Sequence, residues 1–286
     1  MKRPNTASLN CTGLILVIDG DNTLWDTNRV FEDAQHWLLE SLHGAKPSVS
    51  TGLSFEQLRK VDDLFIRESG RQEYDFRLLV LALMFLQKGM TEKDAVSFAL
   101  SGLREHPSNV DAKLATKITQ AFRLRLQEIP PLLPSVSRSL KELLRLKARY
   151  KGRLVLVLLS EGDETRIRPI LECHFGKRRV FDILQIVERK SEDTLRDAQI
   201  QGSKVLESES GCSQIQSQLA VVGDSIASDV VPGNLVGALT IYIPGGYKGI
   251  EAFASDEERP QRVLTDFHQL PELVGNILAA NSKVDL

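Results

Sequence analysis

Two patterns of apolar residues divide the chain of 286 residues. Between about residues 31 and 126 the apolar positions recur every three or four residues, which is the spacing of an amphipathic helix. The pairs Ser54 with Gln57 and Thr91 with Asp94 have the spacing of a capping box, which supports helix starts there. No fixed repeat period is present, so we expect a helical bundle and not a solenoid.

The remainder alternates short apolar runs with helical segments. The runs are almost continuous in Val, Ile and Leu, and they lie at 14–18, 153–159, 182–187, 219–223 and 239–243. Runs of this kind are typical of strands buried on both faces of a parallel sheet. Because helices separate them, we expect βαβ units and an α/β fold with a doubly wound parallel-sheet (Rossmann-like) core.

The helical region interrupts this core after its first strand. The segment Ile129–Ser135 contains three prolines, which a helix interior does not tolerate, so we interpret it as a hinge. We therefore expect a core domain formed by 1–26 and 131–286 and an inserted helical cap domain at 27–130. The polar segment 203–218 is expected to be a helix end followed by a flexible loop.

The composition indicates what class of protein this is. The formal net charge is −2 and the apolar content is 42%, so we expect neither a nucleic-acid nor a membrane partner, and the short basic segments 145–149 and 176–180 are interpreted as solvated surface. Three scattered cysteines, Cys11, Cys173 and Cys212, indicate neither a zinc site nor a disulfide framework. A cytoplasmic protein is the expectation, and the oligomeric state is left open.

Polar side chains follow four of the five predicted strands. Asp19 and Asp21 follow the first, Ser160 the second, Lys190 the third, and Asp224 with Asp229 the fourth. In parallel α/β sheets, ligands bind outside the carboxyl ends of the strands, so these groups are expected to converge. Crowded carboxylates need a cation, and hard oxygen ligands with an open site suit Mg²⁺, so Mg²⁺ is the expected cofactor.

Roles follow from this chemistry. Asp19 is the candidate nucleophile, which would form an acyl-phosphate, and Asp21 is the candidate acid and base for the leaving alcohol and the attacking water. Ser160 and Lys190 are candidates for binding the transferring phosphoryl oxygens. Asp224 is the candidate metal ligand beside Asp19, and Asp229 would hold a metal-bound water or orient Lys190.

These motifs resemble those of the haloacid dehalogenase (HAD) superfamily. The stretch DGDNT is similar to its D-x-D-x-T signature, and LVLVLLS to its second motif, a strand that ends in Ser or Thr. Lys190 resembles the motif III lysine, and VVGDSIASD the fourth motif, G-D-x-x-x-x-D. The helical insert resembles the family's type 1 cap. The resemblance implies that the Asp21 backbone carbonyl also binds Mg²⁺ and that the cap opens and closes over the site.

Asp21 also separates two chemistries within that family. HAD phosphatases carry Asp at this position, whereas the dehalogenases lack it, so the resemblance favours phosphate ester hydrolysis. The predicted activity is Mg²⁺-dependent hydrolysis of a small phosphorylated metabolite through an aspartyl-phosphate on Asp19. A phosphomutase that uses the same intermediate and a catalytically silent scaffold that binds a partner are the alternatives, and a dehalogenase is a weaker one.

Some positions depart from the family pattern. Glu161 and Asp163 add carboxylates beside the expected phosphate pocket, where either they point away or Arg166 neutralises Glu161. The interval from Lys190 to Asp224 is long, and Lys177 is a weaker substitute for Lys190. In the cap, Arg71, Tyr74 and Arg77 are candidates for contact with substrate. Thr23 is expected to bond locally, and Trp25 either to stack on substrate or to pack at the cap hinge.

Overall fold

The computed structural model describes residues 10–45, 52–69, 74–102, 110–210, 214–245 and 253–284. The chain divides into two compact units, a core unit formed by Met1–Asn28 with Ile129–Leu286 and a helical unit formed by Arg29–Glu128. The first strand is therefore separated from the rest of its own unit by the whole helical insertion.

One parallel sheet organises the core unit. Its strands are β1 (Asn10–Ile18), β2 (Leu154–Glu161), β3 (Ile183–Val187), β4 (Gln214–Gly223), β5 (Leu239–Tyr242) and β6 (Arg262–Val263). They lie in the order β3-β2-β1-β4-β5-β6, and every neighbouring pair is parallel. The strand order reverses direction at β1, so the doubly wound α/β fold expected from the sequence is confirmed.

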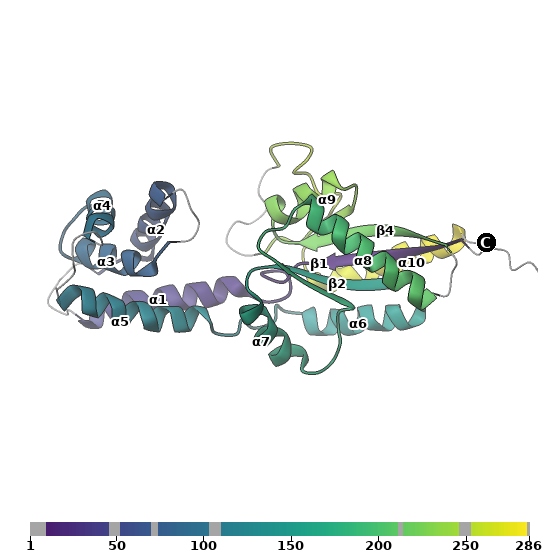
Figure 1. Cartoon of the computed structure of the whole chain (residues 1–286), viewed down its shortest axis with the longest axis horizontal. Coiled ribbons are helices and arrows are strands. Elements are labelled where there is room, and N and C mark those ends of the chain that lie inside the picture. The colour runs from purple at the N-terminus through teal and green to yellow at the C-terminus, as the bar shows by residue number, and fades with distance from the viewer. Residues whose placement is uncertain are drawn as a thin grey trace, which may run out of the picture. The chain divides into compact units, whose positions relative to one another are not determined.

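Alternate residues of β1 face opposite sides of the sheet, as a strand's period of two requires. Leu14, Leu16 and Ile18 pack in a cluster with α6 (Val136–Arg149), α7 (Glu164–Phe175) and α10 (Leu270–Val284). Ile15 and Val17 pack on the other face with α8 (Glu192–Ser210). Helices thus cover both faces (Figure 1), which explains why the strand is apolar at every position from Leu14 to Ile18.

The helical unit has a core of its own. It contains α1 (Thr27–Ala45), whose first two residues belong to the core unit, α2 (Phe55–Ser69), α3 (Phe76–Gln87), α4 (Glu92–Gly102) and α5 (Val110–Leu126). Nearly all of α3 is buried by its neighbours, so this helix is apolar on every side. At the start of α2, Ser54 and Gln57 exchange backbone-to-side-chain hydrogen bonds of 2.9 and 3.1 Å, which confirms that capping box.

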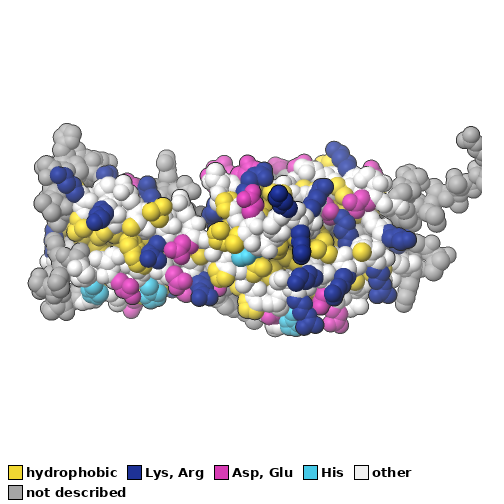
Figure 2. Space-filling view, turned by 90° about the horizontal axis from the view of Figure 1, so that it is seen from below, with side chains coloured by type: hydrophobic (Ala, Val, Ile, Leu, Met, Phe, Trp, Pro, Cys, Tyr) yellow, Lys and Arg dark blue, Asp and Glu magenta, His cyan; other side chains and the backbone are white. Residues whose placement is uncertain are grey.

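The outer surface of the core unit is rich in basic side chains. Figure 2 shows Lys and Arg gathered on one of its faces. Along α6, Arg138, Lys141, Arg145 and Arg149 are all exposed. No helix among the described residues combines the length and the apolar character that a membrane span needs.

One local prediction was half right, and one element was missed. The segment 203–218 begins with the predicted helix end, because α8 ends at Ser210, but the flexible loop was wrong, because Gln214–Gln218 belong to β4 and pair with Asn10–Leu14 of β1. The segment is polar because Gln216 and Gln218 alternate toward solvent at this end of the sheet. The two-residue strand β6 was not expected, and it is too short to produce a period.

Candidate active site

The strand register brings the predicted polar groups to one edge of the sheet. Ile18 of β1 lies opposite Leu158 of β2 and Val222 of β4. Asp19 follows directly, and its backbone N–H donates to the Val222 carbonyl over 2.9 Å. Ser160 lies inside the end of β2, not after it as predicted, because that strand runs on to Glu161. The carboxyl edge of the sheet therefore carries Asp19, Ser160 and Asp224 side by side.

A buried ion-pair network lies at the centre of this edge. The Lys190 ammonium donates to Asp19 Oδ1 over 2.5 Å and to Asp229 Oδ1 over 2.6 Å. All three side chains are at most 6% exposed. Burial alone would lower the pKa of Lys190, but the two carboxylates outweigh it and raise that pKa, so the ammonium stays charged. Lys177, the alternative to Lys190, is exposed to solvent.

Asp229 is held by an irregular turn that follows β4. Residues Ile226–Val230 form a π-helical turn, η1, which continues into α9 (Val231–Leu235). Through this turn Asp229 Oδ2 accepts from the Ser225 N–H over 3.0 Å, while Oδ1 faces Lys190. A Cβ placed on Gly223 would lie 2.0 Å from Asp229 Oδ2, so only glycine leaves room for the carboxylate. The spacing G-D-x-x-x-x-D is thereby explained.

Three carboxylates gather closely enough to hold a metal ion. Asp19, Asp224 and Asp229 each offer an oxygen atom, and these atoms lie within 4.8 Å of one another. Both oxygens of Asp229 accept hydrogen bonds of 3.0 Å or shorter, whereas Asp19 Oδ2 accepts a long one, of 3.3 Å, from Thr23; Asp19 Oδ2 and Asp224 are therefore the more available ligands. Because hard carboxylate oxygens are what Mg²⁺ binds, the donor set fits this ion.

The same crowding changes the proton affinity of the carboxylates. Burial raises the pKa of Asp224 to about 7, and the nearby Asp229 carboxylate adds to the rise. Burial also raises the pKa of Asp19 well above its ordinary value; the Lys190 charge opposes that rise, and Asp229 adds to it. A divalent cation at this position would favour the ionised form of both groups.

Asp21 points to different partners. Its Oδ1 accepts from Trp25 Nε1 over 2.9 Å and from Thr27 Oγ1, and its Oδ2 pairs with the guanidinium of Arg166. The Asp21 side chain is not part of the three-carboxylate group found among the described residues. Trp25 is fully buried, so it packs inside the core unit and does not stack on a substrate there.

The structure shows where the residues that depart from the family pattern lie and what they contact. Glu161 Oε1 accepts from the Lys190 backbone N–H over 2.7 Å. Asp163 caps α7 by accepting from the Thr165 N–H over 2.8 Å. Of the two alternatives for Glu161, neutralisation by Arg166 is wrong, because the Arg166 guanidinium pairs with Asp21. Sequence reasoning did not assign Arg166 or Thr27 to Asp21, since nothing in their spacing reveals a contact across the fold.

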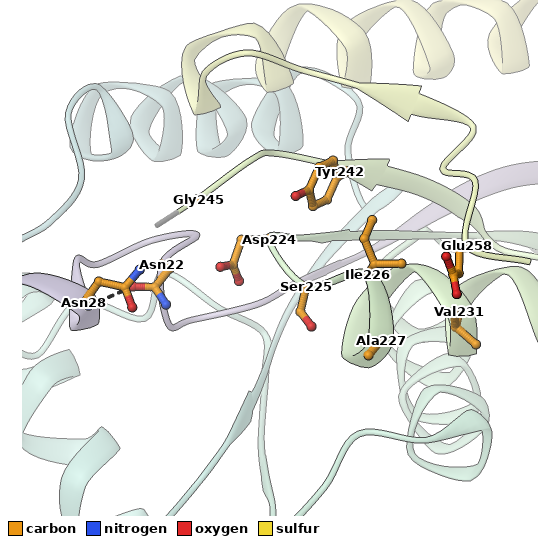
Figure 3. Close-up of a pocket in the computed structure, with 10 residues that line it drawn as sticks. All are labelled: Asn22, Asn28, Asp224, Ser225, Ile226, Ala227, Val231, Tyr242, Gly245 and Glu258. Atoms are coloured by element: carbon orange, nitrogen blue, oxygen red, sulfur yellow. Dashed lines mark hydrogen bonds between the residues drawn. The ribbon is translucent and has the colours of Figure 1, made fainter. Parts of the chain in front are cut away.

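Two further features border this edge. Ser160 Oγ is buried and has no hydrogen-bond partner among the described residues, whereas Thr23 Oγ1 donates to Asp19 Oδ2 over 3.3 Å. A cavity of about 460 Å³ lies beside Asp224. Figure 3 shows Asp224 between Asn22 and Tyr242, with the Asn28 N–H donating to Asn22 Oδ1 over 3.0 Å. The rest of the lining is Ser225, Ile226, Ala227, Val231, Gly245 and Glu258.

The cap candidates have packing contacts within the helical unit. Tyr74 donates to Asp62 and stacks on Phe65, with ring centroids 5.0 Å apart. Arg77 lies 3.7 Å from an Asp75 carboxylate oxygen. Arg71 lies outside the described residues.

Comparisons with known proteins agree with this fold. Residues 189–270 match the family model described as HAD-hydrolase-like. No curated protein is significantly similar to the chain. Among solved structures, a haloacid dehalogenase-like family hydrolase from Xanthomonas campestris is 18% identical, with a TM-score of 0.56 over 96% of this chain and 99% of that one.

Two other solved structures share the fold. A candidate β-phosphoglucomutase from Thermotoga maritima is 13% identical, with a TM-score of 0.52 over 92% of this chain and 99% of that one. A candidate HAD-hydrolase from Bacillus subtilis, bound to magnesium, is 16% identical, with a TM-score of 0.50 over 92% and 99%. The resemblance to the HAD superfamily is thus confirmed in the fold and in the matched segment, which supports a HAD-like hydrolase.

Proposed function

We propose that this HAD-like hydrolase is a Mg²⁺-dependent phosphatase that cleaves a small phosphate monoester through an aspartyl-phosphate on Asp19. The observation that carries the proposal is the contact of 2.5 Å between the buried Asp19 carboxylate and the Lys190 ammonium. A second aspartate, Asp21, follows Asp19 by two residues. A lone buried carboxylate would favour its neutral form, and Lys190 opposes this. The second aspartate supplies the proton that an alcohol leaving group needs.

In the proposed reaction, an oxygen of Asp19 attacks the phosphorus atom and the bond from phosphorus to the ester oxygen breaks. Asp21 gives a proton to the departing alcohol, and in the second step it takes a proton from the water that hydrolyses the aspartyl-phosphate. Lys190 and the free Ser160 hydroxyl bind the phosphoryl oxygens, where negative charge gathers. Asp229 keeps Lys190 in place.

Mg²⁺ would be held by Asp19, Asp224 and the Asp21 backbone carbonyl. When bound, it supplies positive charge that reduces repulsion between the nucleophile and the phosphate. The substrate is proposed to be a small phosphorylated metabolite, because Asp19, Ser160 and Lys190 are 5%, 0% and 8% exposed and a bulky ester would not reach them.

The test is hydrolysis of p-nitrophenyl phosphate with and without Mg²⁺, by the wild type and by Asp19→Asn, Asp21→Asn and Lys177→Met. The expected result is metal-dependent turnover that Asp19→Asn abolishes and Asp21→Asn reduces. Lys177→Met is the matched control, because its side chain is an exposed cation outside the network. Turnover that survives Asp19→Asn would contradict the covalent mechanism.

A negative result with this ester needs a second measurement. Metal-dependent capture of fluoroberyllate by Asp19 would show an intact phosphoryl site with a selective substrate, whereas no capture would favour the silent scaffold. A phosphomutase would instead return the labelled phosphoryl group to a second hydroxyl of a sugar phosphate and release little inorganic phosphate.

A further inference from the structure

The carboxylate of Asp21 is held from three directions. The indole N–H of Trp25 donates to Oδ1 over 2.9 Å, and the Thr27 hydroxyl donates to the same oxygen. The guanidinium of Arg166 donates to Oδ2. Trp25 and Thr27 follow Asp21 closely in the chain, but Arg166 comes from 145 residues away, on α7.

The chain after β2 is built so that Arg166 reaches this position. Asp163 caps α7, and the Arg166 N–H donates to the Asp163 carbonyl over 3.0 Å, so Arg166 lies in the first helical turn. Gly162 has a φ of 130° and would place a Cβ 3.5 Å from the guanidinium. A larger residue there would be strained by this φ, although its Cβ would lie at an ordinary contact distance from the arginine. The short loop between β2, which contains Ser160, and α7 therefore places Arg166 beside Asp21.

The remaining acceptor capacity of Asp21 identifies its reacting oxygen. A carboxylate offers about four acceptor sites, two on each oxygen. Trp25 and Thr27 fill both sites on Oδ1, and Arg166 fills one on Oδ2. The open site is thus on Oδ2, the oxygen that Arg166 holds. Since Arg166 is the single donor on this oxygen among the described residues, it sets the direction of the open site.

We propose that Arg166 is a positioning residue that aims Oδ2 of Asp21 at the leaving-group oxygen. This inference rests on the proposed function, in which Asp21 transfers the proton. Arg166 does not touch the phosphoryl group in this arrangement and acts through Asp21. Its loss therefore affects reactions in proportion to how much they need proton transfer to the leaving group.

Leaving groups of different acidity test this dependence. The p-nitrophenolate group leaves without a proton, whereas an alkoxide does not, so p-nitrophenyl phosphate and a primary alkyl phosphate are compared in the same variants. For Arg166→Met, kcat/KM is expected to fall about 10- to 100-fold for the alkyl ester and less than about threefold for the aryl ester. Arg166→Lys should restore part of the loss. In the Asp21→Asn background, Arg166→Met should add little.

Arg168→Met is the matched control. Arg168 lies two residues further along α7, is exposed and pairs with Glu164, so its loss should leave both esters unchanged. An equal fall for the two esters in Arg166→Met would overturn the proposal, because it would mean that Arg166 binds the phosphate or only supports the fold.

A measurement without turnover separates this inference from the proposed activity. The chain has two tryptophans, and the indole N–H of Trp25 reports on Asp21 by its NMR chemical shift. With Trp37→Phe in every sample to isolate this signal, Arg166→Met is expected to move it toward its position in Asp21→Asn, and Arg168→Met to leave it in place. An unmoved signal in Arg166→Met would refute the positioning role. If the wild type hydrolyses neither ester, the proposed activity fails and the indole signal alone decides the role of Arg166.

Discussion

Replacing Lys190 with methionine should destabilise the core unit strongly and in a pH-dependent way. Met keeps most of the side-chain volume, but it removes the cation that lies 2.5 Å from Asp19 and 2.6 Å from Asp229. Removing one partner of a buried ion pair costs about 3–5 kcal/mol, because the other charge stays buried without compensation. We expect a loss of about 4 kcal/mol at pH 8 without Mg²⁺, a large part of the typical total of about 5–15 kcal/mol.

The sign of the pH dependence follows from the carboxylates. The pKa of Asp19 is raised by burial even with Lys190 present, and removing the ammonium raises it further. A carboxyl group whose pKa is higher in the folded than in the unfolded chain destabilises the fold once both forms are ionised. Its protonation removes that penalty. The deficit of Lys190→Met is therefore expected to be largest at pH 8 and to shrink toward pH 5.

Urea unfolding in a Trp37→Phe background measures this deficit. Trp25 is then the single tryptophan and lies buried in the core unit, so its emission follows that unit. With a slope of about 2 kcal/mol per M, a loss of about 4 kcal/mol lowers the urea midpoint by about 2 M. Lys177→Met, the exposed control, should stay within about 0.5 kcal/mol of the wild type. A midpoint shift below about 0.5 M, or an equal shift at pH 5 and pH 8, would refute the reasoning.

Three further predictions use the same edge of the sheet. Gly223→Ala places a Cβ 2.0 Å from Asp229 Oδ2 and should cost about 1–3 kcal/mol in urea unfolding, while Gly44→Ala, with nothing within 4 Å, should not destabilise. The rise in melting temperature on adding Mg²⁺ should grow as pH increases through about 7, where Asp224 loses its proton; a pH-independent rise would place the ion elsewhere. Ser160→Ala should change the free energy of unfolding by less than about 1 kcal/mol, because its Oγ has no partner, yet raise KM for p-nitrophenyl phosphate; an unchanged KM would remove Ser160 from the phosphate site.

The sequence was sufficient wherever a local pattern carries the information. The apolar runs of the sheet report burial on two faces, and Asp19, Ser160 and Asp224 are found at one edge because parallel strands end together. Contacts made across the fold left no such pattern. From the sequence alone, Arg166 is indistinguishable from any other charged residue near the start of a helix, because its pairing with Asp21 depends on where α7 packs. Likewise, Gln214–Gln218 look like a loop until β1 provides the partner for pairing.

The charges around the site explain how two aspartates can lie so close together after β1. Four aspartates lie at this edge, Asp19, Asp21, Asp224 and Asp229, and the Glu161 carboxylate beside them accepts from the Lys190 backbone N–H. Lys190 forms ion pairs with both Asp19 and Asp229, and Arg166 forms one with Asp21. Among the described residues, no lysine or arginine pairs with Asp224, and this is the group whose pKa is raised to about 7. Two of the four aspartate charges therefore lack a basic side chain, and one divalent cation beside Asp19 and Asp224 would balance them. The proximity of Asp19 and Asp21 is tolerated because their side chains diverge, one toward Lys190 and the other toward Arg166.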